Sequence, residues 1–138
     1  MHHWTFAAPL LAGLALAGCA TGYGPLGPTG GFRETPLAEN AYLLEVQGNA
    51  VGGGRWVNDA ALVRAAELAQ RGGFRSFVVL NEAGELRTMG AVPVPPGFHT
   101  TVIVARMFRQ GEVGEERGLD PDLVLRTVGP RVGYRPTA

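Results

Sequence analysis

The stretch that decides the fold of this 138-residue chain is Val57-Asn-Asp-Ala-Ala-Leu-Val-Arg-Ala-Ala-Glu-Leu-Ala-Gln-Arg71, which runs into Gly72-Gly73. At 100° per residue its apolar side chains share one arc, and its charged side chains share the other. This periodicity predicts a helix from about Val57 to Arg71 with one buried face. On that face we expect Leu62 to be buried, and on the other we expect Arg64 to be exposed.

Three strands are predicted around this helix. Residues 41–47 alternate apolar and polar side chains, as a half-buried strand does. Residues 74–80 are β-branched and aromatic and end apolar on both faces, which is typical of an interior strand, and residues 99–108 form the third. A long proline-containing loop over 81–97 joins the last two strands.

A short helix is predicted over 120–128, with Asp120 as its cap and Pro121 at its first position. The order strand, helix, strand, strand predicts an α+β fold: a small two-layer domain in which a three-stranded sheet carries one main helix. We therefore expect the domain to span 41–117, with the short helix and a basic tail over 118–138.

The N-terminus has the features of an export signal. Residues 1–18 contain no Asp, Glu, Lys or Arg, and His2 and His3 stand where a basic residue is usual. The apolar run 6–17 is shorter than the roughly 20 residues that a membrane-spanning helix needs, but it suits the apolar core of a signal peptide. A buried N-terminal helix with a core cysteine is the structural alternative.

The leader ends in Leu16-Ala17-Gly18-Cys19, which resembles the lipobox of bacterial lipoproteins. The resemblance implies cleavage before Cys19 and acylation of its thiol and new amine. Residues 19–40 would then be the lipidated cysteine and a tether, because Gly or Pro occupies seven of the twelve positions 20–31. Ala20 stands where lipoproteins of the inner membrane typically carry Asp, which implies the outer membrane, facing the periplasm, in a host with two membranes.

Further runs of sequence resemble a family of small bacterial envelope lipoproteins of uncharacterised function. They are 37–42 with Gly48-Asn49, 62–68 with Gly73-Phe74, 77–79 and 128–132. The resemblance covers most of the chain after Cys19, and Gly52-Gly53-Gly54 departs from the Thr-rich segment expected there. It implies a lipoprotein and a fold, but no reaction.

Composition excludes several function classes. Twelve acidic side chains balance twelve basic ones, so no long-range field would recruit nucleic acid. Cys19 is the single cysteine, which rules out an intramolecular disulfide and cysteine-based metal sites. Every basic side chain is Arg, so neither a Schiff-base nor a Walker lysine exists. We predict no cofactor and no metal.

Possible catalytic groups are few. Residues 48–53 fit the first half of a phosphate loop, but Gly54-Arg55 stands where Lys-Ser/Thr is required. Ser76, His99 and Asp59 are the residue types of a hydrolytic triad. Ser76 lacks the G-x-S-x-G turn that exposes a nucleophilic serine, so structural roles are favoured. Two acidic pairs, Glu115 with Glu116 and Asp120 with Asp122, lie in polar stretches without the apolar surroundings that the acid of a glycoside hydrolase needs.

Two segments could contact partners. Arg126, Arg131 and Arg135 follow one another without an acidic residue and suit an anionic surface, although such a charge run is more often a solvated tail. Residues 93–96, Pro-Val-Pro-Pro, would form a polyproline II segment, either a docking motif or a stiff loop.

These observations predict a non-enzymatic, lipid-anchored envelope protein with a binding or structural role. Its expected partners are the membrane, through acyl chains on Cys19, and an envelope protein or wall component. Two alternatives stay open: an envelope stress sensor or signalling lipoprotein, and a weakly marked wall hydrolase.

Overall fold

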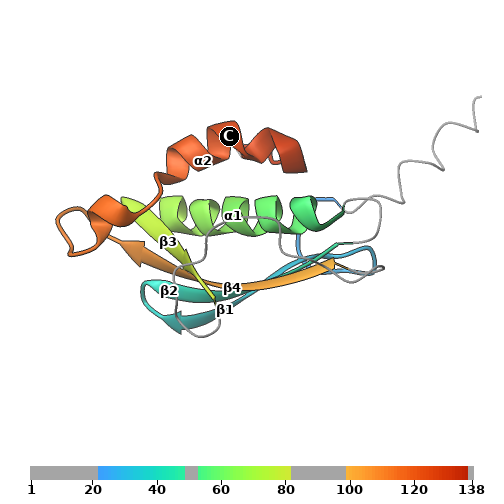
Figure 1. The fold of residues 1–138 in the computed structure, drawn as a ribbon, viewed down its shortest axis with the longest axis horizontal. Coiled ribbons are helices and arrows are strands. Elements are labelled where there is room, and N and C mark those ends of the chain that lie inside the picture. Colours follow the sequence, from blue (N-terminus) through green and yellow to red (C-terminus); the bar gives the residue numbers. More distant parts are fainter. Residues whose placement is uncertain (1–21, 49–52, 82–98, 137–138) are drawn as a thin grey trace, which may run out of the picture.

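A computed structural model describes residues 22–48, 53–81 and 99–136 of the chain. It contains one antiparallel sheet of four strands in the order β1-β2-β4-β3, with the long helix α1 packed on one face (Figure 1). The elements are β1 (Gly31–Ala38), β2 (Ala41–Gly48), α1 (Gly53–Arg71), β3 (Ser76–Leu80), β4 (His99–Phe108), the 3-10 helix η1 (Glu115–Arg117), α2 (Pro121–Thr127) and the 3-10 helix η2 (Gly129–Val132). The α+β class is confirmed.

The central pair of strands sets the core. β2 and β4 are antiparallel, with Leu44 opposite Ile103 and Val46 opposite Thr101, and all four side chains are buried beneath α1. Side chains alternate between the faces of a sheet, so Arg106, between the buried Ala105 and Met107, lies on the face away from the helix. The strands predicted at 41–47, 74–80 and 99–108 correspond to β2, β3 and β4, with β3 beginning at Ser76.

The expected count of three strands is wrong, because β1 is a fourth. It pairs antiparallel with β2, with Phe32 opposite Val46 and Glu34 opposite Leu44. Its residues belong to the segment 19–40 expected to be a tether, and the residues before it also contact the domain: the N–H of Phe32 donates to the carbonyl of Gly24 at 2.9 Å. Pro36 is tolerated because β1 is an edge strand, which needs ladder hydrogen bonds on one side only.

The expected two layers become three, because α2 and η2 cover the side of α1 that faces away from the sheet (Figure 1). Val124, Leu125 and Val132 from this C-terminal layer belong to the same hydrophobic core as α1. A helix between two layers is buried almost all round, and its small side chains allow both neighbours to approach closely. Fully buried alanines in α1 are Ala60, Ala61, Ala65, Ala66 and Ala69.

The expected exposure of Arg64 is therefore wrong. Arg64 is 7% exposed and Glu67 is 6% exposed, whereas Leu62 is only partly buried against the core. The helical periodicity is correct, but the inference that α1 buries a single face is not.

The C-terminal helix has the cap that the sequence predicts. Asp120 Oδ1 accepts hydrogen bonds from the N–H groups of Asp122 at 2.9 Å and Leu123 at 3.4 Å, and Pro121 occupies the first position of α2.

We predict that Ala66→Leu lowers the free energy of unfolding by about 1–3 kcal/mol, because added methylenes have no room between two packed layers. Arg55→Leu, which adds leucine at an exposed position of the same helix, should change it by less than about 0.5 kcal/mol. Urea unfolding of both variants is the measurement. An equal loss in the two would show that α1 is not confined between layers.

Candidate functional site

A buried ion cluster joins β1 to the middle of α1. The Arg64 guanidinium donates from Nε to Glu34 Oε2 at 3.3 Å, from Nη2 to the other oxygen of Glu34, and from Nη1 to Glu67 Oε1. Its carbon lies 4.4 Å from the centre of the Phe32 ring, which adds a cation–π contact. Burial acts to lower the pKa of Arg64, but the hydrogen bonds and charge of Glu34, with the charge of Glu67, outweigh it and raise that pKa. Arg64 therefore remains a cation.

Tyr23 fastens the segment before β1 to this cluster. Its hydroxyl donates to Glu67 Oε2 at 3.4 Å, and its ring lies 5.0 Å from Phe32 and 5.6 Å, edge to face, from Tyr134. Burial, followed by the negative charge of Glu67, raises the pKa of Tyr23 well above its ordinary value. The hydroxyl consequently stays protonated and continues to donate at physiological pH.

These side chains form one wall of a surface hollow of about 520 Å³, here called the Tyr23 hollow. Arg71, whose side chain is 57% exposed, lies on its rim and pairs with Glu67 at 3.2 Å. Arg135 is exposed beside it and forms no ion pair within the described residues. The hollow is lined by Tyr23, Gly24, Pro25, Phe32, Arg64, Glu67, Arg71, Gly133, Tyr134 and Arg135.

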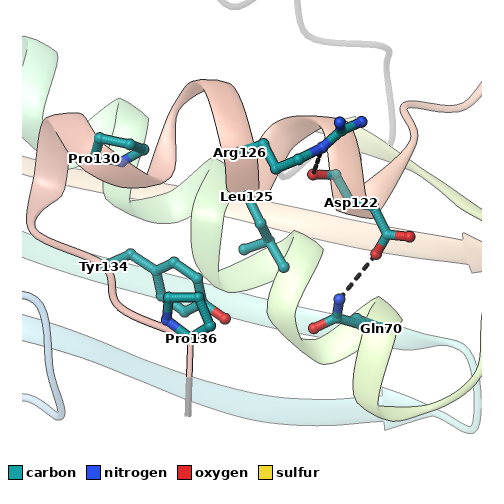
Figure 2. Close-up of a pocket in the computed structure, with 7 residues that line it drawn as sticks. All are labelled: Gln70, Asp122, Leu125, Arg126, Pro130, Tyr134 and Pro136. Carbon is teal, nitrogen blue, oxygen red and sulfur yellow. Dashed lines mark hydrogen bonds between the residues drawn. The ribbon is translucent and has the colours of Figure 1, made fainter. Parts of the chain in front are cut away.

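A second hollow, of about 560 Å³, lies between α1 and the C-terminal layer (Figure 2). Gln70 donates to Asp122 Oδ1 at 2.8 Å across one end, and Arg126 Nε donates to the Asp122 carbonyl at 3.4 Å. Leu125, Pro130, Tyr134 and Pro136 supply apolar wall. Tyr134 lines both hollows, so the segment after η2 separates them.

The three arginines expected to face an anionic surface do not form one cluster. Arg126 lines the second hollow, Arg135 lines the Tyr23 hollow, and Arg131 is paired with Asp59 at 3.4 Å. Arg135 shares the lining of its hollow with the exposed Arg71.

The residues weighed for catalysis are kept apart by the sheet. Ser76 stands opposite Phe108 at one end of β4, and His99 begins that strand nine residues earlier, about 30 Å away at the rise of a strand. Ser76 is buried and donates to the carbonyl of Glu115 at 2.8 Å. The three residues Ser76, His99 and Asp59 therefore cannot act as a triad in this fold.

The acidic residues have structural partners. Glu115 accepts from the N–H of Gly111 at 2.9 Å and lies 3.8 Å from Arg75, and Glu116 lies at the surface 4.0 Å from Arg117. Asp120 caps α2, and Asp122 accepts from Gln70. Among the described residues, no group of three or more His, Cys, Asp and Glu side chains could hold a metal ion.

Several predicted features lie outside the described residues: Leu16, Ala17, Gly18, Cys19, most of loop 81–97 with residues 93–96, and the middle of the glycine-rich 48–55 segment. None of the helices in the described part of the chain is both long and apolar enough to cross a bilayer. No protein-family model matches the chain, and searches of curated proteins and of solved structures find no match.

Sequence reasoning missed Tyr23, Glu34 and the burial of Arg64. The composition of α1 could have indicated this burial, because its alanines and valines occupy more than one face of the helix. A helix that is apolar on most sides is typically covered on more than one side.

We predict that Arg64→Met lowers the free energy of unfolding by about 3–5 kcal/mol, because it leaves Glu34 without its cation and Glu67 with only the more exposed Arg71. Arg131→Met removes a pair whose arginine side chain is 59% exposed and should cost at most about 1 kcal/mol. Chemical unfolding measures both. An equal loss of unfolding free energy in the two variants would contradict the assignment of Arg64 as a buried structural cation.

Tyr23 should also make stability depend on pH in the alkaline range. A raised pKa means that the folded state holds the phenol proton more tightly than the unfolded chain, whose tyrosine titrates near 10.0. The stabilisation is therefore complete below that pH and is lost as pH rises above it. We expect the melting temperature of Tyr23→Phe to fall less steeply than that of the wild type between about pH 9 and about pH 11. Parallel slopes would contradict the assignment.

Proposed function

We propose that this protein is a lipid-anchored component of the bacterial cell envelope whose small domain binds or buttresses another envelope component. The observation that carries the proposal is the uncharged leader ending in Leu16-Ala17-Gly18-Cys19, with Cys19 the only cysteine in the chain. In a host with two membranes, Ala20 favours the outer membrane facing the periplasm.

The position of the folded domain supports this proposal. The hydrophobic core uses residues from Phe32 onward, and the first described contacts involve Tyr23 and Gly24. Cleavage before Cys19 would therefore leave every described helix and strand intact, so the mature chain keeps its core.

A binding role is favoured over a catalytic one by the site chemistry. Ser76 and the acidic pairs engage in structural hydrogen bonds or ion pairs, whereas the two hollows are open surfaces with polar rims. The second hollow combines an apolar wall with Asp122 and Arg126 at its edge, which suits a segment of a protein partner (Figure 2).

The anchor is tested by mass spectrometry of the N-terminal peptide from protein made in its native host. We expect a peptide that begins at acylated Cys19, and Cys19→Ser should accumulate as a precursor with its leader attached. Several acyl chains give stable anchoring, because each buried methylene contributes about 0.8 kcal/mol. A free Cys19 thiol, or a mature chain that still begins at Met1, would refute the proposal.

The binding role is tested by in-cell crosslinking from a photoreactive residue at Arg126, with one at Thr100 on the sheet as the matched control. We expect a discrete adduct with an envelope protein or wall fragment from position 126 only. A product released from added wall material by the purified protein would instead support the hydrolase alternative.

A further inference from the structure

The chain between the proposed acylation site and the first fixed residue of the domain is shorter than the tether expected over 19–40. Tyr23 is fixed by its hydrogen bond to Glu67 and by ring contacts with Phe32 and Tyr134, and only three residues separate it from Cys19. Four residue steps span at most about 14 Å, whereas a free tether over 19–40 would reach on the order of 70 Å. If Cys19 is acylated, the domain is confined to the bilayer surface.

This confinement selects the surface that meets the membrane. Tyr23 lies in the wall of the Tyr23 hollow, so the rim of that hollow is the part of the domain nearest to the anchor. Attraction to headgroup charge falls off within a Debye length, about 8 Å at physiological salt. On this argument Arg71 and Arg135 on the rim come within range of the headgroups, whereas Arg106 on the outer face of β4 does not.

The charge of the hollow fits such a contact. Its ionisable lining contains Arg64, Arg71 and Arg135 against one carboxylate, Glu67. Arg64 is buried between Glu34 and Glu67, so the accessible cations are Arg135 and Arg71, the second of which also pairs with Glu67. A guanidinium presents paired N–H donors that match two oxygens of a phosphate group.

We propose that the Tyr23 hollow is the membrane-facing surface of this domain, and that Arg71 and Arg135 on its rim bind phosphate headgroups of the bilayer that holds Cys19. This inference rests on the proposed lipid anchor and adds to it a fixed orientation. The hollow beside Arg126 then stays available to other envelope components.

The test uses acylated full-length mature protein in vesicles of phosphatidylethanolamine and phosphatidylglycerol. Because acylation consumes the sole thiol, a new cysteine can be labelled alone. Pro136→Cys places a fluorophore next to Arg135, where the chain passes from the lining of the Tyr23 hollow to that of the second hollow, and Arg106→Cys places one on the outer face of the sheet. We expect a nitroxide on the lipid headgroups to quench the label at 136 strongly and the label at 106 weakly.

Charge variants test the headgroup contact in the Pro136→Cys background. Arg135→Glu should lower the population of the membrane-facing orientation by roughly 25-fold, about fivefold for each of the two units of charge that change, and Arg106→Glu should leave it unchanged. Vesicles of phosphatidylcholine alone should weaken quenching at 136. A flexible insertion of about ten Gly and Ser residues after Ala20 should reduce the difference between the two labels without disturbing the fold.

Each outcome separates this inference from the function on which it rests. A Cys19 peptide without acyl chains refutes the anchor itself. Anchored protein that quenches equally at 136 and 106 refutes the orientation and leaves the anchor standing. Unequal quenching that persists both in Arg135→Glu and in phosphatidylcholine vesicles refutes the headgroup contact. The short segment between Cys19 and Tyr23 would then be sufficient to orient the domain.

Discussion

The buried guanidinium of Arg64 is the constraint on which the rest of the structure depends. It lies at 9% side-chain exposure, where an unpaired charge would be very costly, and its partners come from a strand and from its own helix. Glu34 can reach it only if β1 lies beside β2 in the observed register, because a slip of one residue would turn Phe32 and Glu34 to the opposite face. The ion cluster thereby specifies where the edge strand pairs.

The same cluster links the two ends of the described chain. Glu67 accepts from both Arg64 and Tyr23, and Tyr23 in turn packs against Tyr134 beyond η2. A buried ion pair adds little net stability compared with apolar residues of the same size, but it favours one arrangement over others. Here the arrangement brings residues 22–30, α1 and the C-terminal segment together around one hollow. Removal of a single partner should therefore weaken the packing of all three segments.

This architecture also changes what an anchored protein of this kind could do. A domain on a long tether samples the space above a membrane, whereas a domain fixed close to its lipid presents one face to the bilayer and the remaining faces outward. If Cys19 is acylated, the packing of Tyr23 therefore determines which surfaces of the domain remain accessible. The apolar hollow at the C-terminal layer becomes the surface on which a partner would be sought.

The sequence by itself determined the elements whose signals are local: the periodicity of α1, the alternation in β2, the apolar runs of β3 and β4, and the Asp120-Pro121 start of α2. It also carries the uncharged run 1–18 and Cys19, from which the proposed leader is inferred through adjacent residues alone. Only the tertiary structure decided that β1 joins the sheet and that Arg64 is buried. The reason is that Glu34 and Arg64 are 30 residues apart, and Tyr23 and Glu67 are 44 apart. A charged side chain is read as exposed until its distant partner and the layer that covers it are known, and neither is written into the neighbouring sequence.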